Sequence, residues 1–159
     1  MEQILEILER DNRITPEQIA VMLNQSVEEV KAAIKKLEDE QIILRYKTLI
    51  NWEKTDREFV TALIEVKVTP QRGEGFDKVA ERIYKYPQVK AVYLMSGGFD
   101  LTVIIEGRTM KEVALFVAEK LAPMESVLST ATHFVLKKYK DEGVIFEEKE
   151  KDDRQVITL

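Results

Sequence analysis

The chain has 159 residues, of which 45% are hydrophobic and 33% are charged, and its formal net charge is -5. This composition indicates one or two small globular domains and excludes a disordered chain. Cysteine is absent, which excludes disulfides and thiolate metal sites, and a single histidine, His133, leaves little room for a zinc site or a histidine-based triad. The sequence has no apolar run near the roughly 18 residues of a membrane span and no signal-peptide pattern, so we expect a cytoplasmic protein without cofactor or membrane partner.

The start of the chain, residues 1–43, predicts three short helices. Apolar residues recur at helical spacing in "ILEIL", and "TPEQ" predicts a second helix capped by Thr15. A tight turn at "NQ" precedes "SVEE", where Ser26 opens a capping box and a third helix. Two helices joined by a tight turn are the pattern of a helix-turn-helix, so we predict a DNA-binding domain here.

A linker is predicted over residues 44–56. The stretch "ILRYKTLI" (43–50) alternates between apolar and basic or polar residues with period two, which predicts an extended arm or linker strand. The following "NWEKTD" (51–56) is the predicted domain boundary, because the apolar rhythm changes beyond it.

Residues 57–140 predict a ferredoxin-like domain. In chain order we expect a strand over 58–68, a helix over 76–86, strands over 89–95 and 100–105, a helix over 109–122 and a strand over 126–139. This βαββαβ order places two helices on one face of an antiparallel sheet, so the fold class is α+β. The other face and the edges of the sheet need cover, which predicts an oligomer. Residues 141–159 are predicted to be a charged C-terminal tail, in which "VIF" at 144–146 can add a short strand.

The two middle strands are joined by "SGGFD" (96–100), a stretch that allows two interpretations. Paired glycines form hairpin turns far more often than ligand sites, and Asp100 can cap such a turn. Glycine backbone can also approach a ligand closely and offer N–H groups to a carboxylate, while an aspartate can pair with an ammonium group. The residues alone therefore leave both a plain turn and a site for a zwitterion open.

The order of these elements resembles the Lrp/AsnC family of transcription regulators, from about Gln3 to Tyr139. The family's "ILxxL" helix, "TGxxD" hairpin and "VxxTxTxxxL" strand are matched by Ile4, Leu5 and Leu8, by Ser96, Gly97 and Asp100, and by Val127, Thr130, Thr132 and Leu136. The resemblance implies that the C-terminal domain dimerises, that dimers assemble into higher oligomers such as octamers, and that a small effector, usually an amino acid, binds between dimers near the hairpin. The candidate effector-binding residues are Ser96, Gly97, Gly98, Asp100, Thr130 and Thr132.

Double-stranded DNA is the expected macromolecular partner. If the third helix enters a major groove, its polar and basic side chains can meet base edges and phosphates, and basic residues beyond it can reach flanking phosphates. The candidate DNA-binding residues are Gln25, Ser26, Lys31, Lys35, Lys36, Arg45 and Lys47. The family usually has an arginine where this chain has Ala33 and a glycine where it has Gln41.

The charge of the head keeps other functions open. Residues 1–56 hold 8 Lys and Arg against 12 Asp and Glu, a net charge of -4 that is unusual for a DNA-binding domain. Binding is therefore expected to need several heads acting through an oligomer. One alternative is an effector-binding interaction partner whose degenerate head no longer holds DNA. Another is an enzyme similar to the siroheme decarboxylases, which the single histidine and scattered arginines fit poorly.

Overall fold

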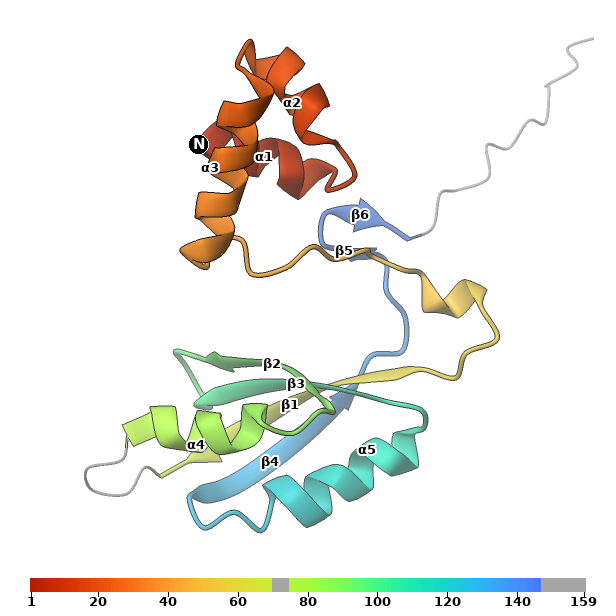
Figure 1. Ribbon diagram of the computed structural model, residues 1–159. Helices are drawn as coiled ribbons and strands as arrows, with labels where there is room; N and C mark the ends of the chain where they lie inside the picture. The colour runs from red at the N-terminus through yellow and green to blue at the C-terminus, as the bar shows by residue number, and fades with distance from the viewer. Residues whose placement is uncertain (70–74, 147–159) are drawn as a thin grey trace, which may run out of the picture. The chain divides into compact units, whose positions relative to one another are not determined.

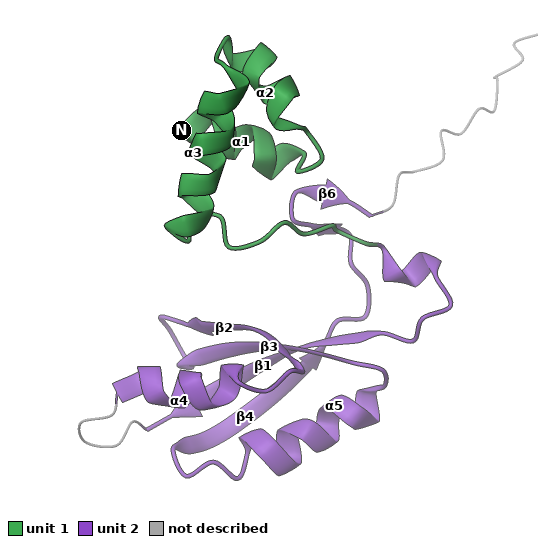
Figure 2. Cartoon of the chain, viewed as in Figure 1, with its two compact units in different colours: residues 1–50 green, residues 51–159 purple. Residues whose placement is uncertain are grey.

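The computed structural model describes residues 1–69 and 75–146. The chain divides into two compact units, residues 1–50 and 51–159 (Figure 2). Most of the predicted charged tail, from residue 147 onward, lies outside the described residues. Within the described ranges, no helix combines the length and the apolarity needed to cross a bilayer.

The first unit, which we call the head, is the predicted bundle of short helices. They are α1 (Glu2–Arg10), α2 (Pro16–Leu23) and α3 (Val27–Asp39). Their apolar stripes meet in a core whose buried residues are Ile4, Ile19, Ala20, Val30 and Leu37. Each such side chain contributes about 1.5–3 kcal/mol relative to exposure, or less for alanine, so this small core depends on well-formed helix ends.

Both predicted capping boxes are present in the head. The Thr15 hydroxyl accepts a hydrogen bond from the Gln18 N–H at 3.3 Å, and Gln18 Oε1 accepts one from the Thr15 N–H at 2.9 Å. The Ser26 hydroxyl and Glu29 repeat the exchange at the start of α3. Asn24, in a left-handed conformation with φ 52°, ends α2 and makes the tight turn. These local bonds fix the helix-turn-helix geometry.

The end of α3 is closed by a Schellman motif. Gln41 adopts a left-handed conformation with φ 57°, the Ile42 N–H donates to the Leu37 carbonyl at 2.9 Å, and the Gln41 N–H donates to the Glu38 carbonyl at 3.0 Å. Glycine is the residue usually found at such a position, because a side chain strains the left-handed backbone. The left-handed backbone therefore explains why the resembled family usually has glycine at this position, where this chain has Gln41.

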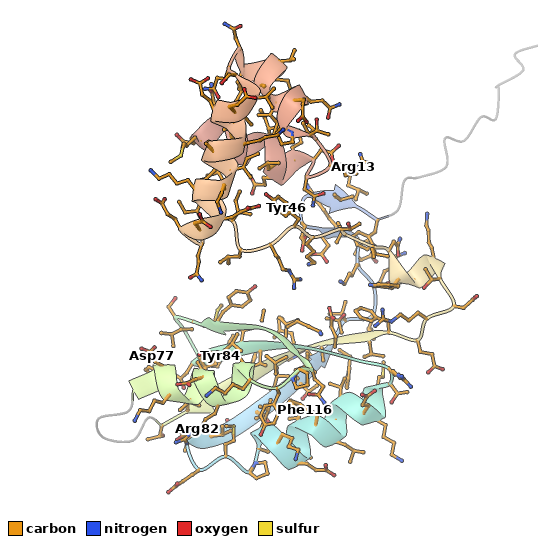
Figure 3. The ribbon with its side chains drawn as sticks, viewed as in Figure 1. Arg13, Tyr46, Asp77, Arg82, Tyr84 and Phe116 are labelled. Atoms are coloured by element: carbon orange, nitrogen blue, oxygen red, sulfur yellow. The ribbon has the colours of Figure 1, made fainter. Side chains whose placement is uncertain are left out.

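The predicted linker strand is not formed in the protomer. Residues 44–50 are irregular, since they have no ladder partner among the described residues, and a short 3-10 helix follows over Trp52–Lys54. The arm is held against the helices by the hydroxyl of Tyr46, which is labelled in Figure 3 and donates to Glu38 Oε1 at 2.9 Å. Asn12 Nδ2 also donates to the Lys47 carbonyl at 3.0 Å. Alternation alone predicted a strand, but a strand requires a neighbouring strand to pair with.

The second unit is the predicted ferredoxin-like domain. Its elements are β1 (Val60–Val68), α4 (Gly75–Tyr84), β2 (Val89–Leu94), β3 (Leu101–Gly107), α5 (Met110–Phe116), a π-helical turn η2 (Val117–Leu121) and β4 (Val127–Phe134). The antiparallel sheet has the order β2-β3-β1-β4, and α4 and α5 lie on one face of it (Figure 1). The α+β fold is therefore confirmed, although the last strand ends at Phe134 rather than at residue 139.

The two faces of the sheet differ in burial. Ala62, Ile64 and Val66 alternate along β1 toward the helices and are fully buried. They pack with helix residues including Phe116, which Figure 3 labels. The Phe116 ring meets that of Tyr86 edge-on, with centroids 5.2 Å apart. The intervening residues of β1 face away from the helices and are only half-buried or exposed. This open face is the surface for which the sequence predicted an oligomeric partner.

A second, small sheet follows β4. It pairs β5 (Lys140–Asp141) with β6 (Val144–Ile145), which confirms the short strand predicted within 144–146. Glu142 and Gly143 both have positive φ, 45° and 80°, as a two-residue hairpin turn of type I′ requires.

Candidate functional site

The candidate DNA-binding residues fall on two parts of the head. Gln25 and Ser26 are exposed at the turn before α3, and Lys31, Lys35 and Lys36 are exposed along that helix. The remaining two, Arg45 and Lys47, lie on the irregular arm. The Ser26 hydroxyl is occupied by its own helix cap, since it accepts from the Glu29 N–H and donates to Glu29 Oε2 at 2.9 Å. Ser26 therefore meets DNA only if it gives up this cap.

The lysines of α3 all have carboxylate partners. Lys31 Nζ lies 2.8 Å from Glu17 Oε1, which joins α3 to α2 across the turn. Lys35 pairs with Asp39 at 3.4 Å, and Lys36 with Glu40 at 3.7 Å. A phosphate that binds these ammonium groups has to compete with carboxylates already in place. This arrangement explains how an acidic head can present a row of lysines without self-repulsion.

The pair between Lys31 and Glu17 perturbs both groups. The hydrogen bond from Lys31 lowers the pKa of Glu17 to about 2, and the same bond raises the pKa of Lys31. Both side chains are exposed, with 56% of each accessible, so solvent screens the pair and DNA phosphate can exchange for it. Glu17 could not be predicted as the partner of Lys31 from the sequence, because no helical i,i+4 spacing relates the two residues.

The hairpin after β2 is fastened by Asp100. Its Oδ2 accepts a hydrogen bond from the Val68 N–H at 2.7 Å, and its own N–H donates to the Val66 carbonyl at 3.1 Å. The Met95 N–H closes the hairpin on the Asp100 carbonyl at 2.8 Å. Asp100 thus ties the hairpin to the end of β1. The described residues supply no hydrogen-bond donor to its second carboxylate oxygen, Oδ1.

The two glycines of the hairpin have different backbone requirements. Gly97 has φ +128°, a conformation in which any side chain is strained, so the turn itself requires glycine there. Gly98 has no such φ, and a Cβ built on it meets no atom within 4 Å. The fold of the protomer therefore tolerates other residues at Gly98. Ser96, Gly97 and Gly98 are all exposed in the protomer.

The two threonines lie on the neighbouring strand. Thr130 is opposite Val66, the residue whose carbonyl receives the Asp100 N–H, so Thr130 and Asp100 flank β1 at the same level. Thr132 is opposite Ile64, two residues farther along. Both threonines share the helix-covered face with Val66 and Ile64 and are half-buried. The protomer brings Thr130 closer to the hairpin than Thr132.

No described group of three or more histidine, aspartate or glutamate side chains is arranged to hold a metal ion. The hydrogen bonds and ion pairs of the candidate residues fall into two sets. One set lies on α3 and the other at the hairpin.

Two family models match the chain. A winged helix-turn-helix DNA-binding domain matches residues 2–43, and an Lrp/AsnC ligand binding domain matches residues 61–145. The chain belongs to the Lrp/AsnC family of transcription regulators. The resemblance predicted from the sequence is thereby confirmed, and this Lrp/AsnC regulator combines a helix-turn-helix DNA-binding domain with a ligand-binding domain.

Similar proteins are named as regulators. The HTH-type transcriptional regulator YugG of Bacillus subtilis is 53% identical over 157 residues, which span 98% of this chain and 95% of that protein. The proline dehydrogenase transcriptional activator of Rhizobium radiobacter is 25% identical, with 89% and 90% of the two chains covered.

Solved structures of the same fold include two complexes. A transcriptional regulator of Neisseria meningitidis bound to L-methionine has a TM-score of 0.71 and 24% identity, over 87% of this chain and 88% of that one. A feast or famine regulatory protein of M. tuberculosis complexed with L-methionine has a TM-score of 0.72 and 18% identity, over 98% and 95%. At these identities the likeness concerns the fold.

Proposed function

We propose that this Lrp/AsnC regulator is a cytoplasmic, non-enzymatic protein that senses an amino acid at the hairpin of residues 96–100 and binds double-stranded DNA through α3 and the arm. The observation that carries the sensor is the hairpin itself. Exposed glycine backbone lies beside a carboxylate whose Oδ1 has no donor among the described residues. Backbone N–H groups suit the effector's carboxylate, and Asp100 suits its ammonium group. The L-methionine complexes of similar folds support an amino acid as the effector.

The sheet supports an oligomer as the sensing unit. The face of the sheet that α4 and α5 leave open includes Leu63, Ile104 and Ala131, and exposed Tyr93 continues it onto β2. A second copy of the chain would bury this face and would bring further cover toward the hairpin. The arm also presents exposed Leu44, and it has no strand partner among the described residues, so it can gain one from another copy.

Oligomerisation would also compensate for the weak DNA binding expected of a single acidic head. One head offers a few lysines that already have carboxylate partners, so each head is expected to bind DNA weakly. Several heads on one assembly bind with an effective concentration that multiplies weak contacts. An effector shifts DNA binding only if it has unequal affinity for assemblies that place the heads differently.

The effector site is tested by calorimetric titration of L-methionine and L-leucine into wild type and Asp100→Asn. Asparagine keeps an acceptor for the Val68 N–H but removes the charge, so the unit stays folded while affinity falls by at least about tenfold. Gly98→Val should abolish binding at the hairpin without loss of stability, because its Cβ meets no atom within 4 Å. Unchanged affinity in both variants would show that the hairpin is only a turn.

DNA binding is tested by anisotropy with the DNA upstream of the protein's own gene. Affinity should fall with salt at a logarithmic slope of about -0.9 per neutralised phosphate. The double variant with Lys31→Ala and Lys35→Ala should lose DNA binding and keep its oligomeric state. No rise in anisotropy with wild type at low salt would instead favour the interaction partner with a degenerate head, for which the acidic head and the paired lysines are the supporting observations.

A further inference from the structure

A separate space lies at the other end of β3 from the hairpin. The strand begins beside Asp100 and ends at Gly107, which pairs with Val60 at the start of β1. Around this end, a pocket of about 670 Å³ is lined by the segment before β1, the loop before β2 and the end of β3. A narrower pocket of about 250 Å³ continues from it along α5. The two pockets share Gln88, Glu106, Gly107 and Glu112.

The wider pocket carries charges of both signs. Its lining residues include the cations Arg57, Lys90 and Arg108 and the carboxylates Glu58, Glu106 and Glu112. Its volume is within the range of small-molecule sites, which is roughly 300–1,000 Å³. A lining with charges of both signs suits a molecule that is itself both cation and anion.

Arg57 is held in position by its neighbours. Its guanidinium carbon lies 4.4 Å from the centre of the Trp52 ring and 5.9 Å from that of Phe59. The backbone N–H of Arg57 donates to the Thr55 hydroxyl at 3.3 Å, and that hydroxyl donates to the Trp52 carbonyl at 2.8 Å, so the backbone that carries the stacked guanidinium is also held. A guanidinium ordered in this way loses less conformational entropy when it binds a carboxylate.

The narrower pocket is mainly apolar at its inner wall. Its accessible apolar surface comes from Leu115, which is 46% exposed, and from the edge of Phe116, which is 8% exposed, whereas Ile105 and Val113 behind them belong to the packed core. A Cβ at Gly107 would meet Val113 Cγ2 at 3.0 Å, so glycine is what lets the end of β3 approach α5. An aliphatic side chain of a ligand fits such a wall better than water does.

Gln88 lies where the two pockets meet and has a polar atom without a partner. Its Oε1 is buried and receives no hydrogen bond from the described residues. A buried acceptor without a donor is costly and is usually satisfied in the functioning protein. An ammonium group at the junction is a donor of the required kind.

We propose that these joined pockets form a second ligand site, which takes a zwitterionic amino acid with an apolar side chain. Arg57 binds the carboxylate, Gln88 with Glu106 binds the ammonium group, and the surface of Leu115 and Phe116 receives the side chain. The inference shares only its ligand class with the proposed hairpin site. Because Arg57 belongs to the segment that leads from the head into β1, occupancy of this site restrains that connection.

Calorimetric stoichiometry with L-methionine and L-leucine tests the site. Wild type should bind two equivalents per chain, Gln88→Met one, Gly98→Val one and the double variant none. Gln88→Met should also raise the Tm of the unliganded protein by about 2–4 °C, because methionine fills the same space without an unsatisfied acceptor. A glutamine with a merely structural role would instead lower the Tm when replaced.

A second variant removes one charge at the rim. Arg57→Gln should weaken the binding of L-methionine at this site at least tenfold. It should hardly change the binding of L-methioninol, which lacks the carboxylate. Wild-type stoichiometry and affinity in Gln88→Met would overturn the second site and leave the hairpin standing. Loss of one equivalent in Gln88→Met with no change in Gly98→Val would support the second site and refute the hairpin. If neither amino acid gives a heat of binding with wild type, the second site and the hairpin site are both refuted.

Discussion

The head and the sheet unit are held together by contacts of different range. In the head, the side-chain bonds that cap the helices join residues three apart, as at Thr15 and Ser26. The pair of Lys31 with Glu17, which joins α3 to α2, and the Asn12 bond to the arm, which spans 35 residues, are longer in range. In the sheet unit, the bond from Val68 to Asp100 spans 32 residues, and the ladders join strands far apart in sequence. The head is therefore sensitive to single caps, whereas the sheet unit is sensitive to its core and its long-range ties.

The largest expected effect is on the core of the sheet unit. Ile64 is fully buried on the central strand β1, so Ile64→Ala should lower the free energy of unfolding of this unit by about 2–5 kcal/mol. Urea denaturation followed by the fluorescence of Trp52, which belongs to this unit, measures the change. Leu136→Ala is the control, because Leu136 is 85% exposed and its removal should cost almost nothing. A head that unfolds earlier to the same extent would show that the two units do not fold separately.

The next effect concerns the long-range tie at the hairpin. Asp100→Ala removes the acceptor of the half-buried Val68 N–H and should cost about 1–3 kcal/mol. Asp100→Asn retains an acceptor and should cost clearly less. Chemical denaturation of both variants without effector separates the structural role of Asp100 from its proposed role with the ligand. Equal losses in the two variants would mean that the charge itself, not the hydrogen bond, stabilises the hairpin.

A single cap should matter in the head. Ser26→Ala removes the hydroxyl that bonds Glu29, so the head should lose about 1 kcal/mol. The neighbouring Gln25→Ala removes a candidate DNA contact without touching the cap, and it serves as the matched control. Helical circular dichroism on heating gives the comparison, and equal melting of the two variants would contradict the importance given to this cap.

One substitution in the head should stabilise it. Gln41→Gly relieves the left-handed strain at φ 57° in the Schellman motif and should add about 0.5–1 kcal/mol. Glu40→Gly, one residue earlier at φ -79°, gains no such relief and should destabilise the helix end. Thermal unfolding measures both changes. A loss of stability in Gln41→Gly would show that the glutamine side chain contributes more than its backbone strain costs.

The smallest effect is a pH dependence of the pair between Glu17 and Lys31. The pKa of Glu17 is about 2 in the folded head, below its ordinary value of 4.5, so its contribution to stability is complete above pH 4.5 and is lost as the pH falls toward 2. Glu17→Gln should remove this part of the acid dependence, and the distant Glu53→Gln should not. Acid titration of the unfolding midpoint measures it. If the unfolding midpoints of wild type and Glu17→Gln fall identically with acidic pH, the ion pair between Glu17 and Lys31 does not form in solution.

The difference in contact range also explains what could be predicted from the sequence. The helices and both capping boxes of the head follow from residues three apart, so "TPEQ" and "SVEE" were sufficient. The βαββαβ order followed from periodicity, and the sheet order agrees with it. The bond from Val68 to Asp100 and the pair of Lys31 with Glu17 were missed, because both arise from tertiary folding and leave no spacing signal.

The missing linker strand and the pocket around Gln88 could not be predicted from sequence patterns. Residues 43–50 alternate like a strand, yet periodicity cannot say whether a partner strand exists, and the protomer supplies none among its described residues. The pocket around Gln88 is lined by residues from the segment before β1, from β3 and from α5, so no local sequence motif predicts it. The fold was therefore more predictable than the sites.

The most direct test of the account is DNA anisotropy with and without each of the twenty amino acids, for wild type and Asp100→Asn. The account predicts salt-dependent binding of wild type whose affinity changes about fivefold or more with at least one amino acid with an apolar side chain, and a response that Asp100→Asn largely loses. Binding to DNA that no amino acid changes, or a response that Asp100→Asn retains in full, would contradict the claim that the hairpin senses the effector for the head.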